Sequence, residues 1–219
     1  RKDNPLIHDN SVDLVVSNCV LNLVNDQDKA QLIKEIFRVT KPGGRIAISD
    51  IISDEFVPED MKNDQHLWSG CISGALQEHE FLEAFVNAGF TAVAYDKWEA
   101  EPWQVVEDIE FRSVTITAIK PSEEKPLDKG QAVIYRGPYA EVYDDEGYVY
   151  FKGLRMAASD KMYAILTSET YKDDFIGIPS DKDVESSEWN AEPGSLRGTN
   201  QTKGRSHKDN TCDSSGGCC

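Results

Sequence analysis

Two apolar runs joined by one amphipathic helix and a glycine turn restrict the fold more than any other feature of this sequence. The first run, VDLVVS at residues 12–17, is short and continuous, which is typical of a strand covered on both faces. The second run, RIAISD at residues 45–50, reads as the next strand. A strand, a helix and a strand in this order form a βαβ unit, so we expect the two strands to be parallel and adjacent.

The segment between these strands carries the signals that start and stop a helix. Asn25 or Asp26 can cap its N-terminus, and the helix is expected to continue to about Thr40. The sequence KPGG at residues 41–44 then supplies a proline and two glycines, which end a helix. Apolar residues recur at helical spacing on one face, at Ala30, Ile33, Ile36 and Phe37.

The following residues extend the same sheet. A short helix is expected from Pro58, and the small residues at 69–76 indicate a loop. Residues 77–90 have the spacing of a second amphipathic helix. Residues 91–100 and 111–120 are strand-like, and the short connection between them favours antiparallel pairing. The expected fold class is therefore α/β, with part of a Rossmann-like sheet that finishes in an antiparallel pair.

Changes in composition predict how the chain is divided. Residues 1–120 form the first domain, and residues 121–130, with two prolines among charges, form a linker. Residues 131–180 contain alternating apolar residues, a DDEG turn and one capped helical stretch, which indicates a small α+β domain. Large apolar residues nearly vanish in residues 181–219, so we expect a disordered tail that ends in a cysteine cluster.

The charge of the chain limits the partners it can have. The 219 residues include 23 Lys and Arg against 39 Asp and Glu, a net charge of −16. Such a chain repels phosphate backbones and anionic lipid surfaces, so we expect neither nucleic acid nor a membrane as a partner. No apolar stretch approaches the roughly 20 residues that span a bilayer.

The cysteines and the N-terminus bear on the compartment. The five cysteines are odd in number and unevenly spaced, and no export signal is visible, which argues against a disulfide scaffold. We therefore expect reduced thiols, a cytoplasmic location and a monomer. The first residue is Arg1 rather than methionine and lies in a polar loop just before a strand, so the chain is treated as a fragment of a longer domain.

Polar residues and a thiol follow the two predicted parallel strands. Ligands bind outside the carboxyl ends of the strands in open α/β sheets. The first strand ends at Asn18 and Cys19, and the second at Ser49 and Asp50, so these residues should face one crevice. A lone cysteine at a strand end is nevertheless more often a small buried hydrophobe than a ligand.

Cys71 is harder to assign to packing. It lies in SGCISGAL, where glycine and serine neighbours indicate a loop in which a thiol is accessible. Packing and ligation are about equally favoured there. No CxxC or HxxxH spacing for zinc, no GxSxG and no GxGxxG is present. The thiols of Cys212, Cys218 and Cys219 form either a plain flexible tail or a group that binds soft ions.

Three stretches together resemble one family. DNSVDLVVSNCVLNLV, EIFRVTKPGGRIAISDI and LWSGCISGAL are similar to segments of S-adenosylmethionine-dependent arsenite methyltransferases. The segment around VIYRGPYAEVYDDEGYVYF resembles the C-terminal domain of that family, and GGCC resembles the cysteine-rich tails of several members. The resemblance implies the C-terminal half of a class I methyltransferase sheet, and a role in arsenic detoxification.

The resemblance also implies roles for individual residues. Cys19 and Cys71 would be thiolate ligands of trivalent arsenic, which is soft and prefers sulfur. Asn18 would line the methionine end of S-adenosylmethionine. Cys212, Cys218 and Cys219 would be accessory thiols. The substrate would be arsenite or a thiol conjugate of it, and the reaction would need a thiol reductant, glutathione or thioredoxin.

Family features that lie N-terminal to this region bear on activity. The resemblance implies a glycine-rich cofactor loop and at least one further cysteine before Arg1, so the fragment alone is expected to be inactive. The third thiolate on arsenic would come from that missing part, from glutathione or from the tail. Two alternatives stay open. One is another class I small-molecule methyltransferase in which both cysteines pack, and the other is a non-catalytic protein that binds metalloids through thiols.

Overall fold

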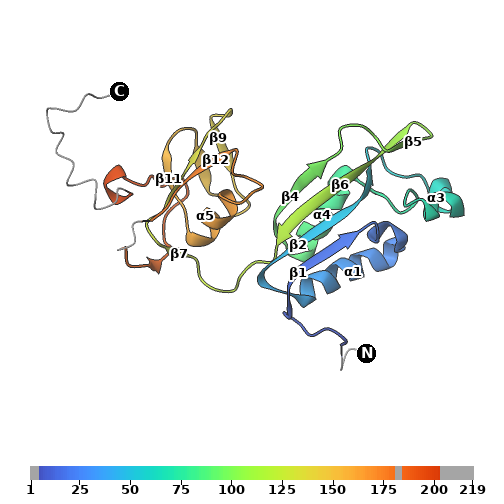
Figure 1. Ribbon diagram of the computed structural model, residues 1–219, viewed down its shortest axis with the longest axis horizontal. Helices are drawn as coiled ribbons and strands as arrows, with labels where there is room; N and C mark the ends of the chain where they lie inside the picture. The colour runs from blue at the N-terminus through green and yellow to red at the C-terminus, as the bar shows by residue number, and fades with distance from the viewer. Residues whose placement is uncertain (1–4, 181–183, 203–219) are drawn as a thin grey trace, which may run out of the picture. The chain divides into compact units, whose positions relative to one another are not determined.

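The computed structural model describes residues 5–180 and 184–202. The chain divides into two compact units, Arg1–Glu123 and Glu124–Cys219 (Figure 1). The first unit is a mixed sheet with helices, and the second is a smaller α+β unit. Across the described part of the chain, none of the helices combines the length and apolar character needed to cross a bilayer.

The βαβ unit predicted from the sequence is present. Strand β1 (Val12–Asn18) pairs in parallel with β2 (Thr40–Ser53), and helix α1 (Asp26–Val39) connects them. In this register Asn18 lies opposite Ser49. The carboxyl end of β1 therefore lies beside the middle of β2, which continues to Ser53 and does not end at Asp50 as the sequence predicts.

The ends of α1 follow from its sequence, whereas the start of β2 differs from the prediction. The Asn25 side chain accepts a hydrogen bond of 2.9 Å from the backbone N–H of Asp28, which caps the helix. β2 begins at Thr40 and not at residue 45. Gly43, at φ +77°, lets the chain turn while its N–H still donates to the carbonyl of Lys120, so the glycine segment continues the strand.

Apart from a short strand at Leu76–Gln77, which pairs in parallel with β2, the rest of the sheet is antiparallel. β6 (Ile109–Ile119) lies between β2 and β4 (Thr91–Trp98), which gives the order β1-β2-β6-β4. This confirms the predicted antiparallel pair. Two short strands that were not predicted, β3 (Leu76–Gln77) and β5 (Gln104–Val106), pair with β2 and β6 respectively. β5 forms because its residues fold back on the start of β6 as a hairpin.

The helices after β2 are shorter than the sequence suggests. The expected helix over residues 58–68 is two helices, α2 (Glu59–Lys62) and α3 (Gln65–Ser69). Asp64 separates them because its carboxylate caps α3 by accepting from two backbone N–H groups. Helix α4 (Glu78–Ala88) forms as predicted and ends where the backbone turns left-handed at Gly89 (φ +105°).

Helices α1 and α4 bury one face of the sheet. The buried side chains are aliphatic and aromatic, and their aromatic members include Phe81 and Phe85 from α4, packed edge to face. Alternate residues of β2 contribute to the same core, among them Ile46, Ile48 and Ile52. This rigid layer is what fixes the strand ends that carry the candidate site.

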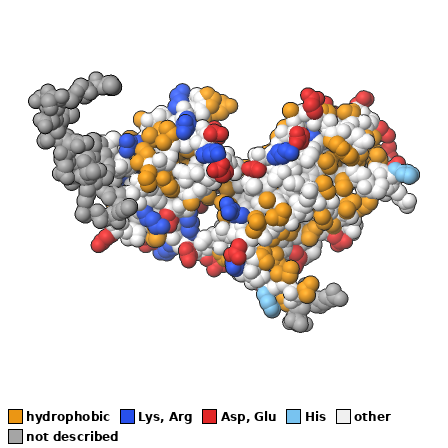
Figure 2. Space-filling model, in the orientation of Figure 1, with side chains coloured by type: hydrophobic (Ala, Val, Ile, Leu, Met, Phe, Trp, Pro, Cys, Tyr) orange, Lys and Arg blue, Asp and Glu red, His pale blue; other side chains and the backbone are white. Residues whose placement is uncertain are grey.

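The opposite face of β1 is open. Leu14 and Val16 are 55% and 66% exposed, although a parallel strand is normally covered on both faces. The prediction that this strand is covered on both faces is therefore not met by the described residues, because α1 and α4 both lie on one side. Figure 2 shows hydrophobic side chains spread over the visible surface of the first unit.

The second unit is built around a three-stranded antiparallel sheet with a hairpin and one helix. β8 is its central strand, with β11 and β12 on either side. Ser159 caps the helix by accepting from the N–H of Met162, as the sequence indicates. The elements are β8 (Ala132–Tyr135), β9 (Glu141–Tyr143), β10 (Val149–Phe151), β11 (Arg155–Ala157), α5 (Asp160–Leu166) and β12 (Phe175–Ile178).

The predicted linker and disordered tail need correction. β7 (Leu127–Asp128), inside the expected linker, pairs antiparallel with β13 (Ser187–Glu188), inside the expected tail, and a short 3-10 turn, η2 (Thr199–Gln201), follows. Trp189 is only 9% exposed, and its Nε1 donates 2.9 Å to the hydroxyl of Tyr148. Residues 184–202 are therefore part of the second unit, because burial of the Trp189 side chain attaches this otherwise polar segment to it.

Candidate thiol site

Cys19 lies directly after β1, at the carboxyl end of the sheet. Its backbone N–H donates 2.9 Å to the carbonyl of Ser49, which extends the pairing of β1 with β2 by one residue. Its thiol is exposed and donates 3.3 Å to Oδ1 of Asn18. The thiol predicted from the sheet rule is thus accessible at the expected edge.

Cys71 lies in the turn at residues 70–75, between α3 and β3. Its N–H donates 3.0 Å to the carbonyl of Trp68, and its side chain is half-buried. Both cysteines have positive φ, +53° at Cys19 and +62° at Cys71. Such a conformation costs a non-glycine residue on the order of 1–3 kcal/mol and persists only where the surroundings impose it.

The side chain of Asn22 connects the two thiol-bearing turns. It is fully buried, and its amide donates 2.6 Å to the carbonyl of Ile51 and 3.0 Å to the carbonyl of Cys71. Gly74 packs against the backbone of Asn22 so closely that an added Cβ would lie 2.0 Å from the Asn22 carbonyl oxygen. The turn carrying Cys71 therefore rests on the turn that follows Cys19.

A buried carboxylate holds the turn that follows Cys19. Asp50 is 1% exposed and accepts hydrogen bonds from the N–H groups of Leu21 (2.9 Å), Asn22 (3.4 Å) and Ile51 (2.9 Å). Burial raises the pKa of Asp50, and these three donors oppose that rise. Its carboxylate thus fixes the backbone that leads from β1 into α1.

The same carboxylate acts on the thiols. Burial first, and then the charge of Asp50, raise the pKa of the Cys19 thiol above its ordinary value. The pKa of Cys71 is raised by burial, by Asp50 and by Cys19. A charge on the Cys19 thiol therefore opposes ionisation of the Cys71 thiol.

A pair of thiols suits one kind of ligand. A soft trivalent metalloid that carries hydroxyl groups condenses with thiols, and each new bond to sulfur releases a thiol proton with a hydroxide as water. No separate base is needed in that exchange. Within the described residues no cluster of three His, Cys, Asp or Glu is placed to hold a metal ion.

Replacing Asp50 with asparagine is expected to lower the pH midpoint for alkylation of both cysteines, because the charge that raises their pKa values is removed. Iodoacetamide labelling across a pH series, read peptide by peptide in a mass spectrometer, measures each midpoint. Asp54→Asn is the matched control, since Asp54 follows the same strand and holds the N–H of Glu110 at 2.9 Å. Midpoints that do not move in Asp50→Asn contradict the assigned coupling.

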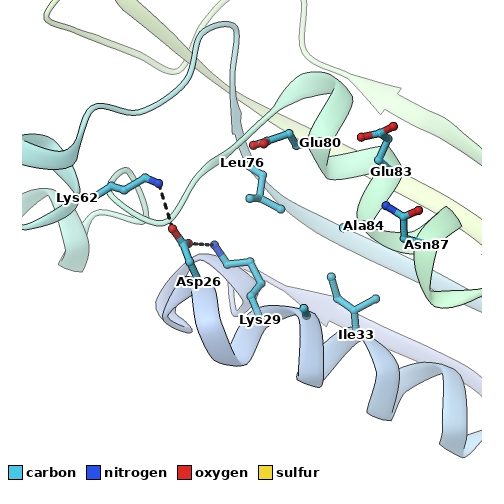
Figure 3. Close-up of a pocket in the computed structure, with 10 residues that line it drawn as sticks. Asp26, Lys29, Ile33, Lys62, Leu76, Glu80, Glu83, Ala84 and Asn87 are labelled. Carbon is cyan, nitrogen blue, oxygen red and sulfur yellow. Dashed lines mark hydrogen bonds and ion pairs between the residues drawn. The ribbon is translucent and has the colours of Figure 1, made fainter.

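A groove between α1 and α4 lies apart from the thiols. Figure 3 shows Glu80 and Glu83 on α4 at one side of this groove. Asp26 lies on the other side, where it accepts from Lys29 (3.2 Å) and Lys62 (3.1 Å). Neither cysteine lines the groove. Its lysines are already paired with Asp26, so we assign no function to it.

Sequence reasoning identified some of these residues and missed others. Asn18 and Cys19 lie together as expected, whereas Cys212, Cys218 and Cys219 fall outside the described residues. Asn22 and Lys29 were missed. A polar residue between two leucines, and a lysine one turn before Ile33 on the apolar face of α1, were the signals that could have revealed them.

Comparisons with known proteins show which family this chain resembles. Residues 2–89 match the family described as "Methyltransferase domain", and residues 122–207 match a domain of unknown function. The arsenite methyltransferase of Mus musculus is 31% identical over 80% of this chain and 48% of its own length. That of Homo sapiens is 32% identical over 79% of this chain and 48% of its own length.

The chain is homologous to arsenite methyltransferases. It spans about half the length of these curated relatives. A solved structure of an arsenic(III) S-adenosylmethionine methyltransferase from Chlamydomonas reinhardtii is 25% identical, with a TM-score of 0.53, over 86% of this chain and 66% of that one. The first unit accordingly has part of the Rossmann-like sheet of class I methyltransferases, and the predicted family resemblance is confirmed.

Proposed function

We propose that this chain is the C-terminal part of an arsenite methyltransferase that transfers a methyl group to thiol-bound trivalent arsenic. The observation that carries the proposal is that Asn22, three residues after Cys19 at the carboxyl end of β1, donates a hydrogen bond of 3.0 Å to the carbonyl of Cys71. Arsenite or its thiol conjugates are the substrate, a thiol such as glutathione or thioredoxin is the reductant, and the setting is arsenic detoxification in the cytoplasm.

Cys19 and Cys71 act as two of three sulfur ligands. Three sulfur atoms around trivalent arsenic leave one lone pair at the apex of a pyramid. Holding that lone pair in line with the methyl donor is the task of the protein, and orientation of this kind is worth about 7–11 kcal/mol of the barrier. No side chain of this chain has to act as nucleophile or base, which fits the absence of a buried histidine from the described edge of the sheet.

The proposed methyl donor is S-adenosylmethionine, which supplies an electrophilic methyl group on a sulfonium. Asn18 is the residue of this chain that we propose to contact its methionine end. The amide of Asn18 is exposed at the carboxyl end of β1, where cofactors of open α/β sheets bind. An amide there can donate to a carboxylate and accept from an ammonium group, so its chemistry fits the cofactor.

The open face and edge of β1 support a site completed by further chain. Within the part of the chain that the structure describes, β1 is an edge strand paired with β2 alone, and it exposes Leu14 and Val16. Parallel strands with this composition normally lie inside a sheet with helices on both faces. We therefore propose that additional strands and helices cover β1 in the active enzyme.

The test is methyl transfer by the full-length gene product. With arsenite, glutathione and methyl-labelled S-adenosylmethionine, we expect methylated arsenic, detected by chromatography coupled to mass spectrometry. Deletion of residues 211–219 should leave the rate within about twofold, because the two site cysteines are not in that segment. A protein that only sequesters metalloids instead gives no methylated product, and loses arsenite binding on the same deletion.

A further inference from the structure

Asn22 occupies a position that neither catalysis nor ordinary packing explains. Its side chain is fully buried, yet it is polar and lies between Leu21 and Leu23. Both of its amide hydrogens are used, one on the carbonyl of Ile51 at 2.6 Å and one on the carbonyl of Cys71 at 3.0 Å. Its own backbone N–H is held at 3.4 Å by the carboxylate of Asp50.

A second polar contact holds the same turn from α1. Lys29 is 3% exposed, and its Nζ donates 2.6 Å to the carbonyl of Gly74. Because Gly74 also lies against the backbone of Asn22, the turn at residues 70–75 is fixed at two carbonyls, three residues apart. Both donors come from the segment that begins three residues after Cys19.

Holding this turn in place matters more for a ligand that binds two sulfur atoms than for a ligand that binds one. Once the first bond from a thiol to arsenic exists, the second forms within one molecule, at an effective concentration set by how well the partner is held in place. Positive φ at both Cys19 and Cys71 means that neither turn is in its lowest-energy backbone conformation on its own. An external hydrogen bond to the carbonyl of Cys71 itself counteracts relaxation of that residue.

We propose that Asn22 is a positioning residue that locks the Cys71 turn onto the Cys19 turn, so that one trivalent arsenical takes both thiols. This inference rests on the proposed function for the identity of the ligand. The exchange it supports is balanced: an arsenoxide and two thiols give one arsenic atom with two As–S bonds and one water. Both thiol protons leave in that water, and no oxidant or reductant takes part.

The experiment uses the 219-residue chain with Cys212, Cys218 and Cys219 replaced by serine, so that only two of its five cysteines remain. The probe is phenylarsine oxide, which can form bonds to two thiols. In this background we expect one equivalent to bind and to protect both thiols from a disulfide reagent. A titration followed by the near-ultraviolet absorption of the As–S bonds gives the affinity for phenylarsine oxide.

Asn22→Ala should weaken the binding of phenylarsine oxide by at least about tenfold. The second thiol is then no longer held near the arsenic, so its effective concentration falls. Each thiol of this variant should still react with the monofunctional disulfide reagent at the rate of the background protein. Asn25→Ala is the matched control. It removes a hydrogen-bonding asparagine three residues away that caps α1 and does not reach the Cys71 turn, so affinity should stay within about twofold.

Asn22→Leu is the second variant, for the case that the cavity left by alanine prevents folding. Leucine has nearly the same volume and no donor, and it should show the same loss of affinity. Unchanged affinity in either folded variant overturns the positioning role. Cys71→Ser in the same background separates this failure from a failure of the proposed function. If Cys71→Ser also leaves the affinity unchanged, the two-thiol site itself is wrong.

Discussion

Replacing Cys19 or Cys71 with serine is expected to reduce arsenite methylation by the full-length gene product at least about 100-fold, while binding of S-adenosylmethionine is retained. A serine oxygen is a hard ligand, and trivalent arsenic strongly prefers sulfur. With one As–S bond lost, the arsenic is tethered at a single point and its lone pair is no longer aimed. Positioning contributes on the order of 7–11 kcal/mol in favourable cases, so even partial loss gives this effect.

Initial rates at saturating arsenite and calorimetric titration of S-adenosylmethionine check this expectation together. Cys212→Ser is the matched control, because it makes the same substitution outside the proposed site and should leave the rate within about twofold. Rates that are unchanged in Cys19→Ser and Cys71→Ser favour the alternative in which both cysteines only pack. Loss of cofactor binding along with activity points instead to a folding defect.

The features that could be predicted from the sequence are those whose signals lie in short segments of the chain. The Asn25 cap of α1 depends on a residue three positions away, and the pairing of β1 with β2, which brings Asn18 beside Ser49, follows from the order strand, helix, strand. Sequence pattern predicts such features because the signals that define each helix or strand lie within that element or next to it. The placement of Cys19 followed from the same local reasoning, together with the rule that ligands bind at strand ends.

Features that depend on distant partners were not predictable in this way. Asn22 contacts Cys71 across 49 residues, and Lys29 contacts Gly74 across 45. From the sequence alone, each is a polar residue among apolar neighbours, and its buried partner cannot be identified. The segment at residues 184–202 was missed for the same reason, since β13 has no apolar pattern and finds its partner β7 some 60 residues earlier in the chain.

Replacing Trp189 with alanine is expected to destabilise the second unit by about 3–5 kcal/mol, the usual cost of removing a buried tryptophan. Trp189 is only 9% exposed, and its ring lies 5.9 Å from that of Tyr148, centroid to centroid. Its backbone N–H also donates 3.0 Å to the carbonyl of Pro126, so the residue ties the end of this unit to its beginning. Hydrogen exchange of the β8 amides measures the free energy of opening for this unit alone.

Two further variants separate packing from hydrogen bonding at this position. Trp189→Phe keeps an aromatic ring but loses the bond to the Tyr148 hydroxyl, so about 1 kcal/mol is expected for the lost bond, plus a smaller packing loss. Leu196→Ala, 61% exposed in the same segment, should change the free energy by no more than about 0.5 kcal/mol. If Trp189→Ala affects β8 exchange no more than Leu196→Ala does, residues 184–202 are a loosely attached tail after all. A large difference between the two makes this segment an integral part of the second unit, whose folded boundary then lies well beyond residue 180.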